Sequence, residues 1–146
     1  MKAVFLIAAL AIAVPASAHE SSVVHNGQSV NLTYEPQIQT RYHQVGIGPR
    51  ATARCQWQTR IAVLRSAVDG EGRAIAALTR KIDAERKRSG SQVGYCVELR
   101  NSSVAPGADA ATVSAHIAAV ARNDAATLHG ELASLASLGA KDSYAR

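Results

Sequence analysis

Aromatic residues are scarce in this sequence of 146 residues, which contains one Phe, one Trp and four Tyr. Proteins that hold single-stranded nucleic acid stack the bases on aromatic side chains. We therefore predict that nucleic acid is not a partner, although the chain carries a formal net charge of +5. Much of the apolar content is alanine, which buries little area per residue, so the core needs a further source of stability.

Several motifs that mark enzyme classes are also missing. The glycines around Ser91 do not stand at the offsets of the G-x-S-x-G nucleophile motif. The segment 46–49, with sequence GIGP, lacks the later glycine and lysine of a phosphate-binding loop. Acidic residues are few and scattered, so no carboxylate pair of the glycosidase type can be identified. We predict a protein without a catalytic site of its own and without a cofactor.

No hydrophobic run is long enough to span a bilayer, since the longest covers residues 3–14 and a spanning helix needs about 20 residues. This run follows Lys2 and precedes Pro15-Ala16-Ser17-Ala18, the order of a secretory signal peptide. We predict a signal peptide over residues 1–18, cleavage near Ala18, and a periplasmic or secreted protein that is not transmembrane.

Only two cysteines occur, Cys55 and Cys96, and they are not in a C-x-x-C arrangement. In an oxidising compartment a single intramolecular pair is the expected arrangement. A free redox pair and an intermolecular link are the alternatives. We predict a disulfide between Cys55 and Cys96, with Trp57 packed over it at the centre of the core.

Alternation of apolar and polar residues predicts strands in the first half of the chain. The polar segment 19–28 is predicted to be a flexible arm, with Asn26-Gly27 as a turn signal. A strand is expected over 29–34, where Pro36 stops it, and further strands over 37–44 and 53–63.

The segment 74–88 supports two interpretations. Asp69-Gly70 lies between two apolar runs, which favours a hairpin whose second strand begins near Arg73. Helix formers are abundant over 74–88, and Ile75, Leu78 and Ile82 have helical spacing, which favours a helix. We favour the hairpin and keep the helix as the alternative.

The last third of the chain predicts helix. Asp109 is a suitable N-cap, and an apolar stripe with helical spacing follows it until Gly139. Asn123-Asp124 interrupts this stripe, so we expect a kink or a break into two helices there. The residues expected to surround Trp57 in the core are Ile61, Val63, Val113, Ile117, Val120, Leu128 and Leu132.

Together these elements predict an α+β fold with an N-terminal antiparallel β-sheet, one or two C-terminal helices and one disulfide. The predicted organisation is a signal peptide over 1–18, an arm over 19–28, a single domain over 29–139 and a tail over 140–146.

Histidines suggest one alternative function. Cleavage after Ala18 exposes the α-amino group and the imidazole of His19 together, and these two groups chelate copper(II) in one ring. This arrangement resembles the first residue of exported copper proteins and copper oxygenases. His25 or His43 is then needed as a second ligand. Glu20 and His25 are too far apart for the H-E-x-x-H zinc motif.

The segment 80–88 suggests a second alternative, because it carries five basic and two acidic residues. Such a segment can bind anionic lipid headgroups, lipopolysaccharide or another polyanion of the envelope. The competing interpretation is a solvated face in which the two acids pair with neighbouring bases. The candidate anion-binding residues are Arg80, Lys81, Arg86, Lys87 and Arg88.

Three features resemble small exported bacterial proteins to which no function is assigned: Arg54-Cys55-Gln56-Trp57, Tyr95-Cys96, and an alanine-rich segment with Asn123-Asp124. The resemblance implies a bacterial envelope location and no site residue. The function expected from the sequence is therefore non-enzymatic binding at the envelope, or a structural role there. Copper binding and polyanion binding are the alternatives.

Overall fold

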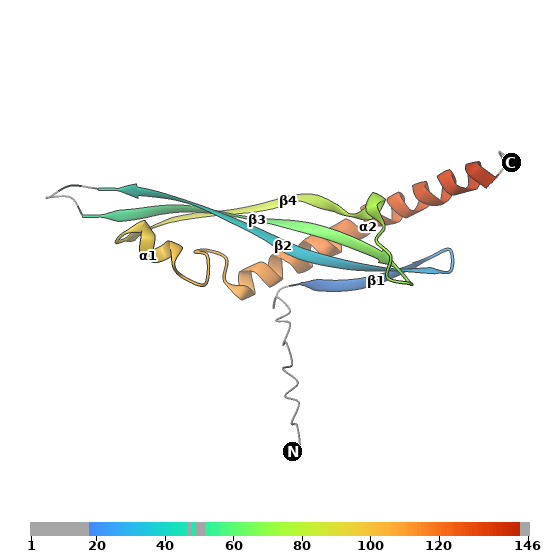
Figure 1. Ribbon diagram of the computed structural model, residues 1–146, viewed down its shortest axis with the longest axis horizontal. Coiled ribbons are helices and arrows are strands. Elements are labelled where there is room, and N and C mark those ends of the chain that lie inside the picture. Colours follow the sequence, from blue (N-terminus) through green and yellow to red (C-terminus); the bar gives the residue numbers. More distant parts are fainter. Residues whose placement is uncertain (1–17, 47, 49–51, 144–146) are drawn as a thin grey trace, which may run out of the picture.

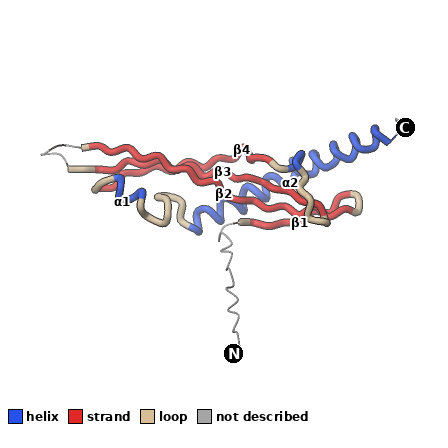
Figure 2. Tube along the Cα trace, in the orientation of Figure 1, coloured by secondary structure: helices blue, strands red, loops and turns tan. Residues whose placement is uncertain are grey.

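The computed structural model describes residues 18–46, 48 and 52–143. Its elements are β1 (His19–His25), β2 (Gln28–Val45), β3 (Arg54–Asp69), a 3-10 turn (Ala76–Leu78), β4 (Arg80–Val93), α1 (Cys96–Arg100) and α2 (Ala110–Ser143). The four strands form one antiparallel sheet in chain order. They run side by side along the long axis of the molecule (Figure 2). The predicted α+β class and antiparallel sheet are confirmed.

Strand β1 corrects the prediction of a flexible arm over 19–28. His19–His25 pairs with β2 through a tight turn in which Asn26 and Gly27 have φ values of 51° and 77°. Positive φ at both central residues is the requirement of the tightest hairpin turns, and Asn-Gly is the sequence that meets it most easily. The polar composition of this strand reflects its place at the sheet edge, where one face and one side lie in water.

Strand β2 is longer than predicted, because Pro36 does not stop it. β1 pairs with β2 only as far as Tyr34, whereas β3 pairs with β2 from Val30 to Val45. A proline is tolerated in a strand where its missing N–H would face an open edge. The two predicted strands over 29–34 and 37–44 are therefore one strand.

The hairpin preferred for 74–88 is confirmed, although its second strand starts later than expected. β3 ends at Asp69, the chain returns through the short 3-10 turn, and β4 runs from Arg80 to Val93. Thr79 bonds back to Ile75 and Ala67, which fixes this connection against β3.

Helix α2 is a single helix and packs on one face of the sheet. It begins after Asp109, whose carboxylate accepts a hydrogen bond of 2.9 Å from the N–H of Thr112, so the predicted N-cap is confirmed. Figure 1 shows α2 crossing the strands obliquely and projecting beyond them at its C-terminal end. The expected break at Asn123-Asp124 is absent, and the helix continues past Gly139 to Ser143.

The core lies between α2 and the middle of the sheet, on both sides of the row in which β1 and β4 begin. Tyr34, Leu32, Ile61 and Leu78 are its largest fully buried apolar side chains from the sheet and its connections. All seven residues expected in the core are buried there. The predicted tail over 140–146 begins inside α2, while residues 144–146 and positions 1–17 of the predicted signal peptide lie outside the described residues.

The predicted disulfide joins Cys55 of β3 to Cys96 of α1. It does not lie at the centre of the core, and neither does Trp57, which corrects that expectation. Trp57 is half-buried between two glycines. A Cβ on Gly90 would lie 2.5 Å from its ring, and a Cβ on Gly107 would lie 3.0 Å from it. The bridge and the tryptophan thus hold the loop before α2 against the far part of the sheet.

Replacing both Cys55 and Cys96 by serine is expected to lower the free energy of unfolding by about 3–4 kcal/mol, because a loop with a sequence separation of 41 residues is no longer closed in the unfolded chain. Denaturant titration of the oxidised and the double-serine protein measures this. An unchanged midpoint would contradict a structural role for the bridge.

Candidate functional site

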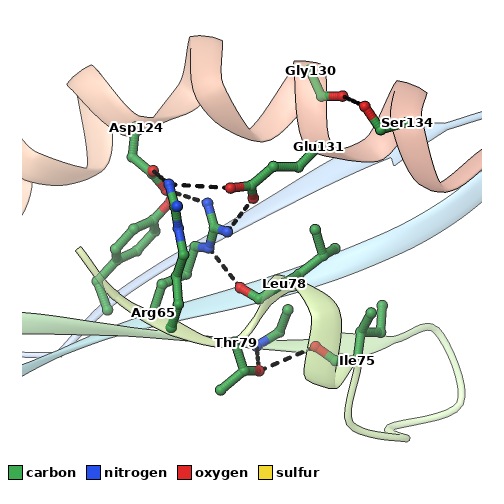
Figure 3. A network of polar contacts seen from close by, with 11 residues as sticks. Arg65, Ile75, Leu78, Thr79, Asp124, Gly130, Glu131 and Ser134 are labelled. Atoms are coloured by element: carbon green, nitrogen blue, oxygen red, sulfur yellow. Dashed lines mark hydrogen bonds and ion pairs between the residues drawn. The ribbon is translucent and has the colours of Figure 1, made fainter. Parts of the chain in front are cut away.

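A buried arginine joins the sheet to α2. Arg65 of β3 is completely buried, and its Nε donates a 2.8 Å hydrogen bond to the carbonyl oxygen of Leu78. Its Nη1 lies 2.6 Å from a carboxylate oxygen of Asp124, and its Nη2 bonds to Glu131. Figure 3 shows both carboxylates reaching down from α2 toward the guanidinium group. We call Arg65, Asp124 and Glu131, with Tyr34 and Arg80, the buried cluster.

The two acids of the buried cluster are satisfied by further donors. The Tyr34 hydroxyl donates a 3.0 Å hydrogen bond to the Asp124 oxygen that Arg65 also contacts. Arg80 lies 3.1 Å from the other side of the Glu131 carboxylate and 3.9 Å from Asp124. Two cations therefore balance two anions. This pairing explains why Asp124 can occupy the apolar stripe of α2 without breaking the helix.

The surroundings shift the pKa values of two members of the cluster. Burial raises the pKa of Tyr34 to about 12, and the negative charge of Asp124 and the hydrogen bond to it act in the same direction. Burial by itself lowers the pKa of Arg65, but the hydrogen bonds to Asp124 and Glu131 outweigh it and raise the pKa above its ordinary value. Both groups keep their protons at neutral pH. The cluster is thus a fixed ion-pair network that holds α2 on the sheet.

The far part of the sheet carries a different set of charges. We define the distal region as residues 37–46, 48 and 52–61, together with 85–100. It contains two acids, Glu85 and Glu98, and seven cations among the described residues. The cations are Arg41, Arg54, Arg60, Arg86, Lys87, Arg88 and Arg100.

Alternation along the strands divides these cations between the two faces of the sheet. The register places Arg60 beside Lys87 on β4 and opposite Gln39 on β2, on the face away from α2. Arg41 and Arg54 share this face because they stand an even number of residues from Gln39 and Arg60. We call it the open face, since no described element covers it: α1 and α2 both pack on the other side.

The open face of the distal region is polar across three strands. Gln39, Gln56, Gln58, Ser89 and Ser91 lie between its cations, and all five are exposed. A shallow hollow of about 210 Å³ is lined by Arg41, His43, Gln56 and Gln58, with Tyr42 and Trp57. Glu85, the acid of the open face in this region, lies 3.6 Å from Arg60. Guanidinium forks and amide groups in this arrangement can bind phosphate, sulfate or carboxylate groups.

The predicted anion-binding segment over 80–88 is not one surface. Arg80, whose side chain is 47% exposed, pairs with Glu131 at the rim of the buried cluster, so its charge is already engaged there. Arg86 and Arg88 follow Ile82 in the alternation and share the helix side of the sheet, whereas Lys81 and Lys87 lie on the open face. Sequence proximity alone grouped these residues. Successive residues of a strand lie on opposite faces of the sheet. Lys87 therefore shares its face with Arg41, Arg54 and Arg60, which belong to other strands.

The three histidines proposed as copper ligands are not brought together. His19 and His25 stand at opposite ends of β1, about 20 Å apart for six residues of extended chain. His43 lies nine residues beyond Tyr34, the partner of His19, which is about 30 Å along β2. Within the described part of the chain, no three His, Cys, Asp or Glu residues gather as metal ligands. The described fold therefore does not bring His19 together with His25 or His43.

The chain matches no family model, no curated protein and no solved structure. Across the described residues, no helix combines the length and apolar character that crossing a bilayer requires. Only the residues themselves can therefore support a function for this chain.

Replacing Asp124 by asparagine is expected to lower the free energy of unfolding by about 3 kcal/mol, because Arg65 then keeps its buried charge without its most deeply buried counter-charge. Chemical denaturation measures the loss. Asp83→Asn, which removes an exposed acid of β4, is the matched control and is expected to change stability by about 0.5 kcal/mol or less. Equal effects of the two substitutions would contradict the structural role of the cluster.

The high pKa of Tyr34 gives a second prediction. Because this pKa is about 12 in the folded chain and 10.0 in its ordinary state, the unfolded chain loses the proton first as the pH rises. Stability from this group is fully present below pH 10 and declines toward pH 12. Denaturation midpoints measured from pH 9 to 12 should fall more steeply for the native protein than for Tyr34→Phe, and parallel curves would contradict the prediction.

Proposed function

We propose that this protein is a non-catalytic binding protein of the bacterial envelope that holds an anionic polymer or lipid headgroup on the open face of the distal region. The observation that carries the proposal is the charge of that region, where seven cations stand against two acids. Four of the cations, Arg41, Arg54, Arg60 and Lys87, share the open face.

The chemistry of this face supports an extended ligand with repeated anionic groups. The exposed guanidinium groups of Arg41 and Arg54 are spread over two strands, not gathered around a closed pocket. Exposed amides such as Gln56 and Gln58 lie between them and can accept or donate hydrogen bonds to hydroxyl groups. A phosphorylated, sulfated or carboxylated polysaccharide presents both kinds of group along its length, and an anionic lipid surface presents the first kind.

A non-catalytic role agrees with the placement of the ionisable groups. The raised pKa of Tyr34 belongs to the buried cluster, where every member is paired and helps to attach α2. Five of the seven distal cations are exposed instead, and the set is dispersed over three strands and α1. Export completes the proposal: the signal-peptide pattern over 1–18 predicts it, and the Cys55–Cys96 disulfide is of the kind that persists outside the cytoplasm.

Two substitutions distinguish this proposal from binding by the linear segment 80–88. Arg54→Gln removes a cation of the open face that lies outside the segment, and Lys81→Gln removes a cation of the segment that lies outside the distal region. We expect Arg54→Gln to weaken binding to immobilised heparin about fivefold, and Lys81→Gln to leave it nearly unchanged. The reverse order would overturn the assignment to the distal region.

Salt and the choice of probe complete this test. Binding of the native protein is expected to weaken steeply between 50 and 300 mM salt, because the screening length of charge interactions falls from about 14 Å to about 6 Å over this range. Vesicles of phosphatidylglycerol, compared with phosphatidylcholine vesicles, separate a lipid surface from a polysaccharide as the anionic partner. Failure to bind heparin and both vesicles at low salt would refute the proposed function.

A further inference from the structure

The outer edge of β2 is open along its second half. β1 covers β2 only from Gln28 to Tyr34, and no described strand lies beside Glu35–Val45 on that side. The unpaired stretch is in regular register with β3 over its whole length. An exposed, regular strand edge is a template onto which another extended chain can add.

The hydrogen bonds of β3 show which groups of β2 face this edge. The carbonyl oxygens of Ala53 and Ala67 accept bonds from Gly94 and Ile75, so the odd-numbered residues of β3 direct their backbone groups toward β4. The even-numbered residues of β3 therefore bond to β2, where their register partners are odd-numbered. It follows that Ile38, Thr40 and Tyr42 direct their N–H and C=O groups outward. Pro36, which has no N–H, fits the same alternation.

An apolar hollow lies beside this edge on the helix side of the sheet. It measures about 210 Å³ and is lined by Ile38, Val104, Ala105, Ala108 and Val113, with Ser103 and Ala110. Ile38 is 40% exposed and Val104 is 53% exposed, so apolar surface remains uncovered. An added strand would direct every second side chain toward this hollow and the others toward the open face.

The opposite edge of the sheet lacks these features. β4 has an irregularity in its pairing with β3 between Ile61 and Val63, and Lys81 and Lys87 are among its outward-facing residues. Bulges and lysines are the features by which natural edge strands resist pairing. Of the two long edges, the second half of β2 is therefore the one suited to accept a strand.

We propose that the open edge of β2 at Glu35–Val45 binds an extended peptide segment of a partner protein, by strand addition, with an apolar side chain in the Ile38–Val104 hollow and acidic side chains toward the open face. Charge complementarity selects the acidic partner. Arg41 lies on this stretch of edge, and Arg54 and Arg60 are the register partners of Val45 and Gln39 on the same open face, whereas Glu35 is the only acid of the stretch. A second copy of the chain would bring two cationic distal regions together, which opposes self-pairing. The proposal does not depend on polyanion binding.

The direct test uses a capped seven-residue peptide in which glutamate and valine alternate. On its addition we expect the amide hydrogens of Ile38, Thr40 and Tyr42 to exchange more slowly, whereas those of Gln37 and Gln39 already bond to β3 and change little. A version with N-methylated valines, and a version with lysine in place of glutamate, should bind at least about tenfold more weakly. Equal slowing of exchange at even-numbered and odd-numbered amides of this stretch would overturn the proposal. Equal binding of all three peptides would also overturn it.

Protein variants provide the matched control. Thr40→Pro removes one outward N–H and should weaken peptide binding about tenfold. Thr40→Val keeps that N–H and loses only the 3.0 Å contact with Thr59, so it should bind normally. Ser89→Pro removes an outward N–H from the β4 edge and should also bind normally. If the amides of the β2 edge are protected in the free native protein and its mass is that of a dimer, a second copy occupies the edge. This result would overturn the acidic-peptide assignment. It would not affect the heparin test of the proposed function.

Discussion

The attachment of α2 to the sheet depends on Arg65, a fully buried cation at the centre of the fold. The apolar stripe of α2 contains several alanines, whose small side chains give the helix little resistance to sliding along the sheet. Asp124 and Glu131 lie seven residues apart, about two helical turns, so both project from one side of α2 toward Arg65. Because leaving the guanidinium group without them is costly, this contact fixes the position of α2 along and around its axis.

Fixing α2 at this point leaves the distal region of the sheet without a long helix. The loop before α2 covers the helix-side face there, held by the Cys55–Cys96 bridge and by the 2.7 Å hydrogen bond from Thr59 to the carbonyl of Pro106. Gln44 adds a bond from the amide of Cys96. The other face and the outer edge of β2 receive no such cover. The two surfaces proposed to bind partners are therefore those that the helix and the bridge do not use.

The sequence predicted the elements that have local signals and missed those that depend on distant partners. The Asn26-Gly27 turn, the Asp109 cap and the buried stripe of α2 need only neighbouring residues. Asp124 was predicted to break the helix because its partner, Arg65, is 59 residues away. The signal was present, since Arg65 occupies an inward-facing position of β3 just as Asp124 occupies one of α2, and pairing the two anomalies would have located both. The cations of 80–88 do not form one surface, because alternation along β4 directs Lys81 and Lys87 to one face and Arg86 and Arg88 to the other.

The distribution of acids explains why the unbalanced charge gathers in the distal region. Asp124 and Glu131 form ion pairs with Arg65 and Arg80, and Asp69 forms an ion pair with Arg73 at 2.7 Å. The pairs with Arg65 are buried under α2, where an unpaired charge is expensive, whereas the Asp69–Arg73 pair lies at the surface. Most of the distal cations are exposed, so water solvates them and the fold does not require an acid beside each one; Arg60, which is half-buried, lies beside Glu85. Their grouping therefore raises repulsion within the sheet. A bound anion is the interaction that would reverse this repulsion, which is the physical reason to look for the partner at this end of the molecule.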